Sequence, residues 1–221
     1  VLDATERLGW LAGRLLADLG ADVAKLEAPR AELGGAEWRA LNVNKRVVRL
    51  DPASADGRER FERLARGADI FLCTPRPGDS PARLLELNPR LVVVAITPFG
   101  LTGPKAAWLA SDLEIMAAGG AMSLAGEPDG MPVRVSAPQA YAWAGAQAAV
   151  GALVAIHHRA ASGRGQLVDV SAQSAVIVAL AHAPAFVDVA GISPTRAGAY
   201  LTGRSVTGAK FRVFWRCRDG Y

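Results

Sequence analysis

The feature that most constrains the fold of this chain is the alternation of short apolar runs with helix-length amphipathic segments. The run LVVVAIT at residues 91–97 is nearly continuous in β-branched residues, which is typical of a strand buried on both faces of a sheet. We expect five further strands, at residues 1–5, 22–27, 46–50, 69–73 and 166–170. Helices are expected at residues 7–19, 55–66, 81–87, 111–121, 140–159 and 171–189. This order predicts an α/β fold, a Rossmann-like parallel sheet with helices on both faces.

The composition predicts a folded domain and excludes several classes of protein. The 221 residues, 51% hydrophobic and 21% charged, are enough for one substantial core. Cys73 and Cys217 are too few for a disulfide framework, so we expect a cytoplasmic protein. No apolar run reaches about 18 residues, so no membrane-spanning helix is expected. The net charge of +4 comes mostly from arginines without interleaved aromatic residues, which argues against nucleic-acid binding.

Metal, dinucleotide and serine-hydrolase sites are not indicated. His157, His158 and His182 have no Cys, Asp or Glu at the spacing of metal ligands, so we expect no metal. The turn after the first expected strand reads TERLGW and lacks the glycines of a dinucleotide-binding loop. No G-x-S-x-G sequence is present. Asp169 ends a strand before a helix, where capping or turn stabilisation is the simpler interpretation.

A series of motifs runs through the chain in a fixed order. They are VLD at residue 1, AGRLLADLGADV at 12, KLE at 25, NVNKR at 42, RPG at 76, NPRL at 88, FGLTGP at 99 and GRGQLVDVS at 163. Together they resemble the amino-terminal part of class III CoA-transferases, a family that includes formyl-CoA and carnitine CoA-transferases and α-methylacyl-CoA racemase. The resemblance covers nearly the whole chain. It implies a large Rossmann-like domain at residues 1–190, followed at residues 191–221 by a linker and the truncated start of a small domain.

The resemblance also identifies a departure at the catalytic position. In these transferases an aspartate attacks the acyl-CoA. It stands four residues before a helix glycine that is followed, six residues later, by another. Here those glycines are Gly145 and Gly151, which places Tyr141 at the position of the nucleophile. A phenol with a pKa near 10 stays mostly protonated at neutral pH and is a poor substitute for a carboxylate. The His-Asp pair of the racemases is Ser111-Asp112 here, so racemase activity is not expected.

The resemblance implies that coenzyme A, as acyl-CoA, is the bound cofactor. The residues expected to contact it are Leu50, Thr74, Pro75, Arg76 and Thr97. Arg76 also follows an expected strand, at the carboxyl edge where α/β sheets bind ligands, and a phosphate is a suitable partner for it. The family sequence ENF before RPG is CTP here, and the next helix is shortened. We therefore expect a smaller or shifted pocket.

Three hypotheses follow. The sequences SDL at 111, PQAY at 138 and TPFG at 97 are similar to a subgroup that includes benzylsuccinate CoA-transferase, in which one kind of subunit carries the aspartate and the other lacks it. The leading hypothesis is a non-catalytic subunit of an acyl-CoA:carboxylate CoA-transferase, as a homodimer or a heteromer with a catalytic paralogue. The second is an active transferase that uses a displaced carboxylate, with Asp112, Glu114 and Asp169 as candidates. The third is an acyl-CoA-binding scaffold.

Overall fold

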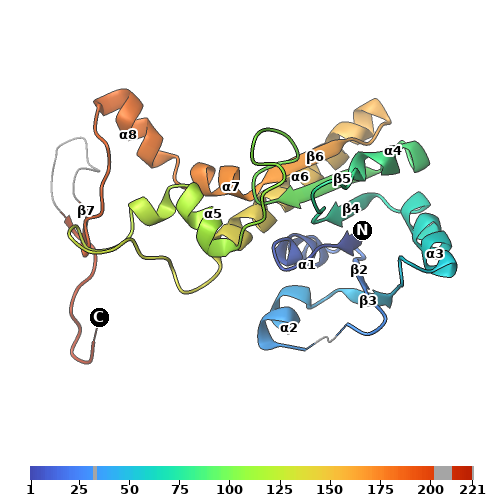
Figure 1. The fold of residues 1–221 in the computed structure, drawn as a ribbon, viewed down its shortest axis with the longest axis horizontal. Helices are drawn as coiled ribbons and strands as arrows, with labels where there is room; N and C mark the ends of the chain where they lie inside the picture. Colours follow the sequence, from blue (N-terminus) through green and yellow to red (C-terminus); the bar gives the residue numbers. More distant parts are fainter. Residues whose placement is uncertain (32–33, 202–210, 221) are drawn as a thin grey trace.

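A six-stranded parallel sheet forms the centre of the computed structural model, which describes residues 1–31, 34–201 and 211–220 (Figure 1). Its strand order is β3-β2-β1-β4-β5-β6, and all neighbouring strands are parallel. The strands are β1 (Leu2–Ala4), β2 (Ala24–Glu27), β3 (Arg46–Arg49), β4 (Ile70–Cys73), β5 (Val92–Thr97) and β6 (Leu167–Ser171). The predicted fold class is confirmed. The strand order reverses between β1 and β4, and in such sheets ligands bind at the carboxyl edge near this point.

Strand β5 shows why the sheet needs helices on both faces. All six of its residues are buried. Val92, Val94 and Ile96 contribute to one core, whereas Val93 and Ala95 contribute to the other. Since successive side chains of a strand point to opposite faces, a strand that is apolar from Val92 to Ile96 requires an apolar layer on each side.

The helices supply these two layers (Figure 1). On the face of Val94 lie α1 (Trp10–Asp18) and α6 (Gln139–Ser162), with α5 (Asp112–Ala118) and α7 (Ala172–Ala179) packed against α6. On the other face lie α3 (Ala55–Arg66) and α4 (Leu84–Leu87), which follows the short 3-10 turn η1 (Pro81–Arg83). A second 3-10 turn, η2 (Ala121–Ser123), follows α5.

Two helical predictions differ from the structure. The single helix expected at residues 171–189 is wrong, because α7 ends at Ala179 and α8 (His182–Ala190) follows after a bend of 60°. Pro184 accounts for the break: in a continuous helix its ring would collide with the carbonyl group of Leu180. The sequence does not predict α2 (Ala36–Asn42), whose seven residues are too few to show a clear period. No single helix in the described ranges is long and apolar enough to span a membrane, although the bent pair α7–α8 meets the length and composition criteria together.

Residues beyond α8 extend away from the sheet (Figure 1). Residues 191–199 contain no helix or strand, as expected of a linker, and β7 (Tyr200–Leu201) then pairs antiparallel with β8 (Phe211–Arg212). The linker contacts the loop after η2, where the Gly198 N–H donates to the Gly126 carbonyl oxygen at 3.0 Å. Residues 202–210 and 221 of the predicted second domain lie outside the described residues.

Candidate functional site

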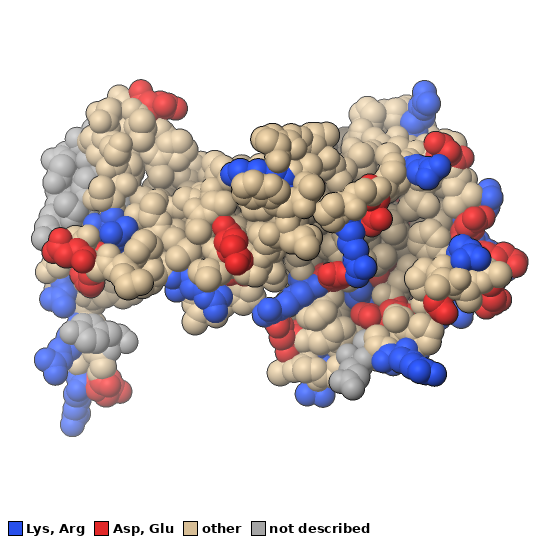
Figure 2. Space-filling model, viewed as in Figure 1, with Lys and Arg blue, Asp and Glu red and all other residues tan. Residues whose placement is uncertain are grey.

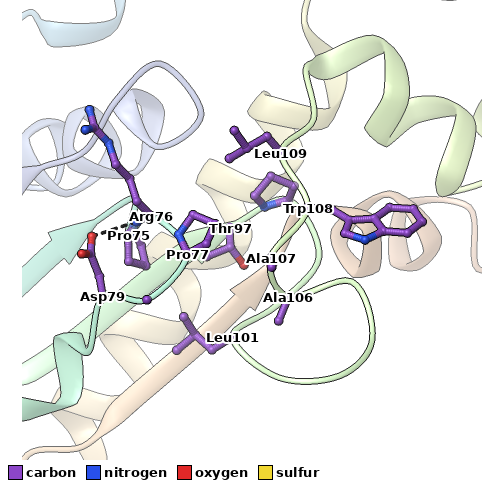
Figure 3. Close-up of a pocket in the computed structure, with 12 residues that line it drawn as sticks. Pro75, Arg76, Pro77, Asp79, Thr97, Leu101, Ala106, Ala107, Trp108 and Leu109 are labelled. Carbon is purple, nitrogen blue, oxygen red and sulfur yellow. Dashed lines mark hydrogen bonds between the residues drawn. The ribbon is translucent and has the colours of Figure 1, made fainter.

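The loops after β4 and β5 enclose a cavity at the carboxyl edge of the sheet (Figure 3). Its volume is about 160 Å³. Pro75, Arg76 and Thr97, three of the five predicted CoA-contacting residues, line it together with Leu101 and Trp108. The structure thus brings together residues from two separate loops at the edge where this sheet topology binds ligands.

The Arg76 side chain lies at the border of this cavity. In Figure 3 it extends away from Trp108, and its Nη2 lies 3.4 Å from Glu6 Oε1. The Asp79 carboxylate accepts a hydrogen bond from the Arg76 backbone N–H at 2.9 Å, which fixes the turn. Because the ion pair with Glu6 is largely exposed to solvent, it is weak, and the guanidinium is available to an incoming anion.

The other two predicted contact residues lie outside this cavity. Thr74 accepts a hydrogen bond on its Oγ1 from the Glu6 N–H at 2.8 Å, so it ties the loop after β4 to the loop after β1. Leu50 is buried directly after β3, three strands from β4. At about 4.8 Å per strand, a ligand that touches both Leu50 and Arg76 has to extend roughly 14 Å along the edge of the sheet.

Tyr141 lies in the first turn of α6, and the packing of that helix fixes its position. A Cβ atom on Gly145 would lie only 2.8 Å from the Leu11 Cβ, so glycine allows α6 to contact α1 closely. At the other end, Gly163 adopts a φ of 71° and terminates the helix in the left-handed conformation. Since Tyr141 precedes Gly145 by four residues, it lies on the same face, over the start of α1.

The Tyr141 phenol borders a second, more apolar cavity of about 290 Å³. The Arg7 Cζ atom lies 5.8 Å from the centre of its ring. Burial raises the pKa of the Tyr141 hydroxyl above its ordinary value, and the Arg7 guanidinium only partly offsets this effect. The phenol is therefore protonated at neutral pH and can donate a hydrogen bond.

Asp112 is the carboxylate nearest to Tyr141 in the hydrogen-bond network. Its Oδ1 accepts from the Ala140 N–H at 2.9 Å and from the Tyr141 N–H at 3.4 Å. It therefore caps the amino terminus of α6 from a neighbouring helix, where a negative charge is favourable. Its Oδ2 is buried without a hydrogen-bond partner, 3.7 Å from Arg134 Nη1.

The two other candidate carboxylates are engaged elsewhere. Glu114 forms a capping box with Ser111 at the start of α5, and the hydrogen bond from the Ser111 hydroxyl lowers the pKa of Glu114. Asp169 accepts from the Leu101 N–H at 2.9 Å. It thus stabilises the loop after β5 and does not cap the following helix, whose cap is Ser171.

Sequence reasoning missed a buried charged cluster beneath this edge. Lys45 Nζ donates to Asp3 Oδ2 at 2.7 Å and to the Trp10 carbonyl oxygen at 2.7 Å, and Asp3 Oδ1 accepts from the Thr5 hydroxyl at 2.6 Å. Lys25 Nζ donates to the Thr5 carbonyl oxygen at 2.6 Å. Burial lowers the pKa of Lys45. These bonds hold the turn that carries Glu6 and Arg7.

A signal for this cluster was present in the composition. The chain has only four lysines, and two of them, Lys25 and Lys45, belong to the KLE and NVNKR motifs. Because arginine and lysine are not interchangeable, a scarce lysine inside a motif is a candidate for a position that needs the compact ammonium group.

The described residues hold no group of three or more His, Cys, Asp or Glu side chains placed to bind a metal ion. On the face shown in Figure 2, Lys and Arg are interspersed with Asp and Glu around α3, and the surface over the loop after β5 is mostly uncharged. The basic residues on this face thus form no single large patch.

The family model for CoA-transferase family III matches residues 1–221, the whole chain. The chain belongs to CoA-transferase family III. It is 36% identical over 242 residues to the succinyl-CoA:(R)-benzylsuccinate CoA-transferase subunit BbsE of Thauera aromatica, an alignment that covers 100% of this chain and 57% of that protein. It is also 36% identical over 195 residues to a formyl-CoA:oxalate CoA-transferase of Streptomyces coelicolor, covering 80% of this chain and 47% of the relative.

Two solved structures have the same fold. A CAIB/BAIF family protein from Brucella suis superposes with a TM-score of 0.84 at 29% identity, over 96% of this chain and 63% of that one. The hypothetical protein Rv3272 from Mycobacterium tuberculosis superposes with a TM-score of 0.71 at 26% identity, over 85% of this chain and 58% of its own. The chain thus spans between 47% and 63% of the length of these four proteins.

Proposed function

We propose that this chain is the large-domain part of an acyl-CoA:carboxylate CoA-transferase and that it acts as the subunit without a nucleophile. In this proposal residues 1–190 form the large domain and residues 191–221 lead into a second, smaller domain. The chain works in the cytoplasm, as a homodimer or together with a catalytic paralogue. The similarity to BbsE, which is named as a subunit of a benzylsuccinate CoA-transferase, supports assembly with a partner.

The observation that carries the proposal is Tyr141. In the chemistry of such transferases the nucleophile is a carboxylate, which is already an anion at neutral pH and needs no general base to attack a thioester. Burial raises the pKa of the Tyr141 hydroxyl, so the group at this position is neutral. A partner subunit with a carboxylate at the equivalent position would supply the missing chemistry.

Coenzyme A is the ligand that the carboxyl edge fits best. We place its phosphates near Arg76 and Thr97, and the rest of the cofactor along the edge from Pro75 and Thr74 toward Leu50. A guanidinium fork is suited to phosphate oxygens. The extended form of the cofactor suits the roughly 14 Å between β4 and β3.

The proposal is tested by measuring CoA transfer with the full-length protein alone and after co-expression with the paralogous reading frame. We expect turnover only in the mixture, since the partner holds the nucleophile. A Tyr141→Phe variant should assemble and support the same turnover at saturating carboxylic acid, because the hydroxyl takes no part in the chemical step. Robust transfer by the protein alone, lost in Tyr141→Phe, would overturn the non-catalytic role.

One observation favours a second candidate, in which the chain is itself active through Asp112. Its Oδ2 is a buried carboxylate oxygen without a hydrogen-bond partner in the described residues, while its Oδ1 accepts a hydrogen bond from the Tyr141 N–H at 3.4 Å. Only 5% of the residue is exposed, so a substrate could reach it only after the segment around Arg134 moved.

Trapping decides between the two candidates. Hydroxylamine added during acyl-CoA turnover converts an enzyme thioester to a hydroxamate, which mass spectrometry locates. Modification of Asp112, Glu114 or Asp169 would establish an active chain. An unmodified chain beside a modified partner is the result that the leading proposal requires.

A further inference from the structure

We propose that the cavity between α1, α2 and the first turn of α6 binds the carboxylate of a small apolar carboxylic acid, with Arg7 and Tyr141 as its recognition groups. This inference deepens the proposed function and rests on it for the role of the acid as a CoA acceptor. The binding step itself can be measured without transfer.

Most of the cavity wall is apolar. The apolar lining consists of Leu11, Ala40, Leu41, Ala137, Pro138 and Ala142. The volume of about 290 Å³ lies at the small end of ligand cavities. A wall of this kind favours an aliphatic or aryl group and disfavours a nucleotide or a free phosphate, whose charged surface would lose its hydration there.

Two polar groups at the cavity, from Arg7 and Tyr141, have hydrogen-bond donors that are free to bind a ligand. The Arg7 guanidinium lies over the Tyr141 ring, with its Cζ 5.8 Å from the ring centre. Within the described residues, neither Arg7 Nη1 nor the Tyr141 hydroxyl has a hydrogen-bond partner. A guanidinium N–H and a phenol O–H beside an apolar wall match the two oxygens of a carboxylate.

Glu37 sets the position of the arginine and also competes with the ligand. Its Oε1 accepts from Arg7 Nε at 2.9 Å, and Arg7 Nη2 lies 2.9 Å from the same oxygen. This pair occupies one edge of the guanidinium and leaves Nη1 for an acid. The negative charge of Glu37 opposes a second carboxylate at this short range. Arg7 therefore raises the affinity for the acid, whereas Glu37 lowers it.

The test is a calorimetric titration of the full-length protein with 3-phenylpropanoate and, as the uncharged match, 3-phenylpropanamide. We expect the acid to bind and the amide to bind at least about tenfold more weakly, because a charge-assisted hydrogen bond is lost. Arg7→Met, which keeps the apolar stem, should weaken acid binding about tenfold or more. Tyr141→Phe should weaken it about threefold to tenfold.

Two further variants make the test independent of folding. Glu37→Gln should tighten acid binding, an outcome that damage to the fold would not produce. Arg39 lies on the same helix as Glu37 but does not line the cavity, so the control variant Arg39→Met should leave acid binding unchanged. Equal affinity for acid and amide, no binding of the acid at millimolar concentration, or unchanged binding in Arg7→Met would overturn the inference. Acid binding without CoA transfer in any mixture would instead refute the proposed function and leave the acid site standing.

Discussion

At the scale of single residues, burial decides which side chains of the carboxyl edge can react. Cys73 ends β4 and precedes the residues that line the cavity in Figure 3, yet its thiol is buried and points its Sγ toward the Val94 carbonyl oxygen at 3.7 Å. Burial raises the pKa of the Cys73 thiol to about 12. Cys217, by contrast, is exposed.

Alkylation should therefore separate the two cysteines. With iodoacetamide at pH 8 we expect the native protein to be modified at Cys217 and not at Cys73, since the thiolate is the reactive form. Mass spectrometry of the native and the denatured protein checks the labelling, and rapid native labelling of Cys73 would contradict the prediction.

The buried Cys73 thiol also makes the free energy of unfolding depend on pH. Because its pKa in the folded protein lies above that of an exposed thiol, its contribution to stability is complete below about pH 9 and is lost as the pH rises toward 12.

Asp112 offers a second prediction at this scale. Asp112→Ala removes the acceptor for the Ala140 N–H and should lower the free energy of unfolding by about 1–2 kcal/mol. Asp112→Asn should cost less, because the amide oxygen can still accept that bond and the unpartnered charged oxygen is gone. Urea unfolding followed by circular dichroism measures both. If the two variants lost equal stability, the capping role would be wrong.

At the scale of elements, the contact between α1 and α6 depends on small residues. The residues of α6 that are buried are all alanine or glycine: Ala140, Ala144, Gly145, Ala148, Ala149, Ala152 and Ala155. Helices lined in this way approach closely, so the site at the first turn of α6 is positioned by backbone proximity rather than by large interlocking side chains.

A matched pair of valine substitutions tests this packing. Gly145→Val should destabilise the protein by about 1–3 kcal/mol, because the Cβ alone would come within 2.8 Å of the Leu11 Cβ and 3.2 Å of the Ala12 nitrogen. Ala146→Val introduces the same side chain at the next residue, which is exposed, and should lower the free energy of unfolding by less than about 1 kcal/mol. Thermal unfolding compares them, and equal melting temperatures would mean that the helices have room to separate.

The same elements show how far the sequence predicts the structure. Strand β5 could be predicted because its pattern is complete within seven residues, and the α/β order followed from its neighbours. The position of Tyr141 on the same face of a helix as Gly145 could also be predicted, because the two residues are only four positions apart in the sequence. The contact between Tyr141 and Arg7 could not be predicted, since it depends on how α1 crosses α6. Pro184 by itself predicts a break in the helix. We nevertheless predicted one helix, because the apolar pattern continues without interruption on both sides of the proline.

At the scale of the whole molecule, the residues beyond α8 differ from the sheet domain. Every residue from 211 to 220 is exposed, whereas Arg159 in α6 keeps only 13% of its side chain exposed and bonds the Asp69 and Arg90 carbonyl oxygens. Backbone that is exposed and outside long helices is where proteases cut first.

Limited trypsin digestion should therefore cut this chain at Arg212, Arg216 or Arg218 before it cuts within residues 1–190. We expect a stable large fragment that retains the sheet, identified by intact-mass measurement over a time course. Earlier cleavage inside α3 or α6 would contradict the proposed boundary of the large domain.

Lys25 forms ion pairs with Asp3 and Glu27, and Lys45 forms one with Asp3, so these four groups link β1, β2 and the residue before β3 as one neutral set. Removing one member leaves an unpaired charge in the interior, so single substitutions should be strongly destabilising, whereas charge-compensated double substitutions should be tolerated better. An engineer could therefore alter the pocket wall one side chain at a time, but would have to exchange the ion pairs beneath it two residues at once.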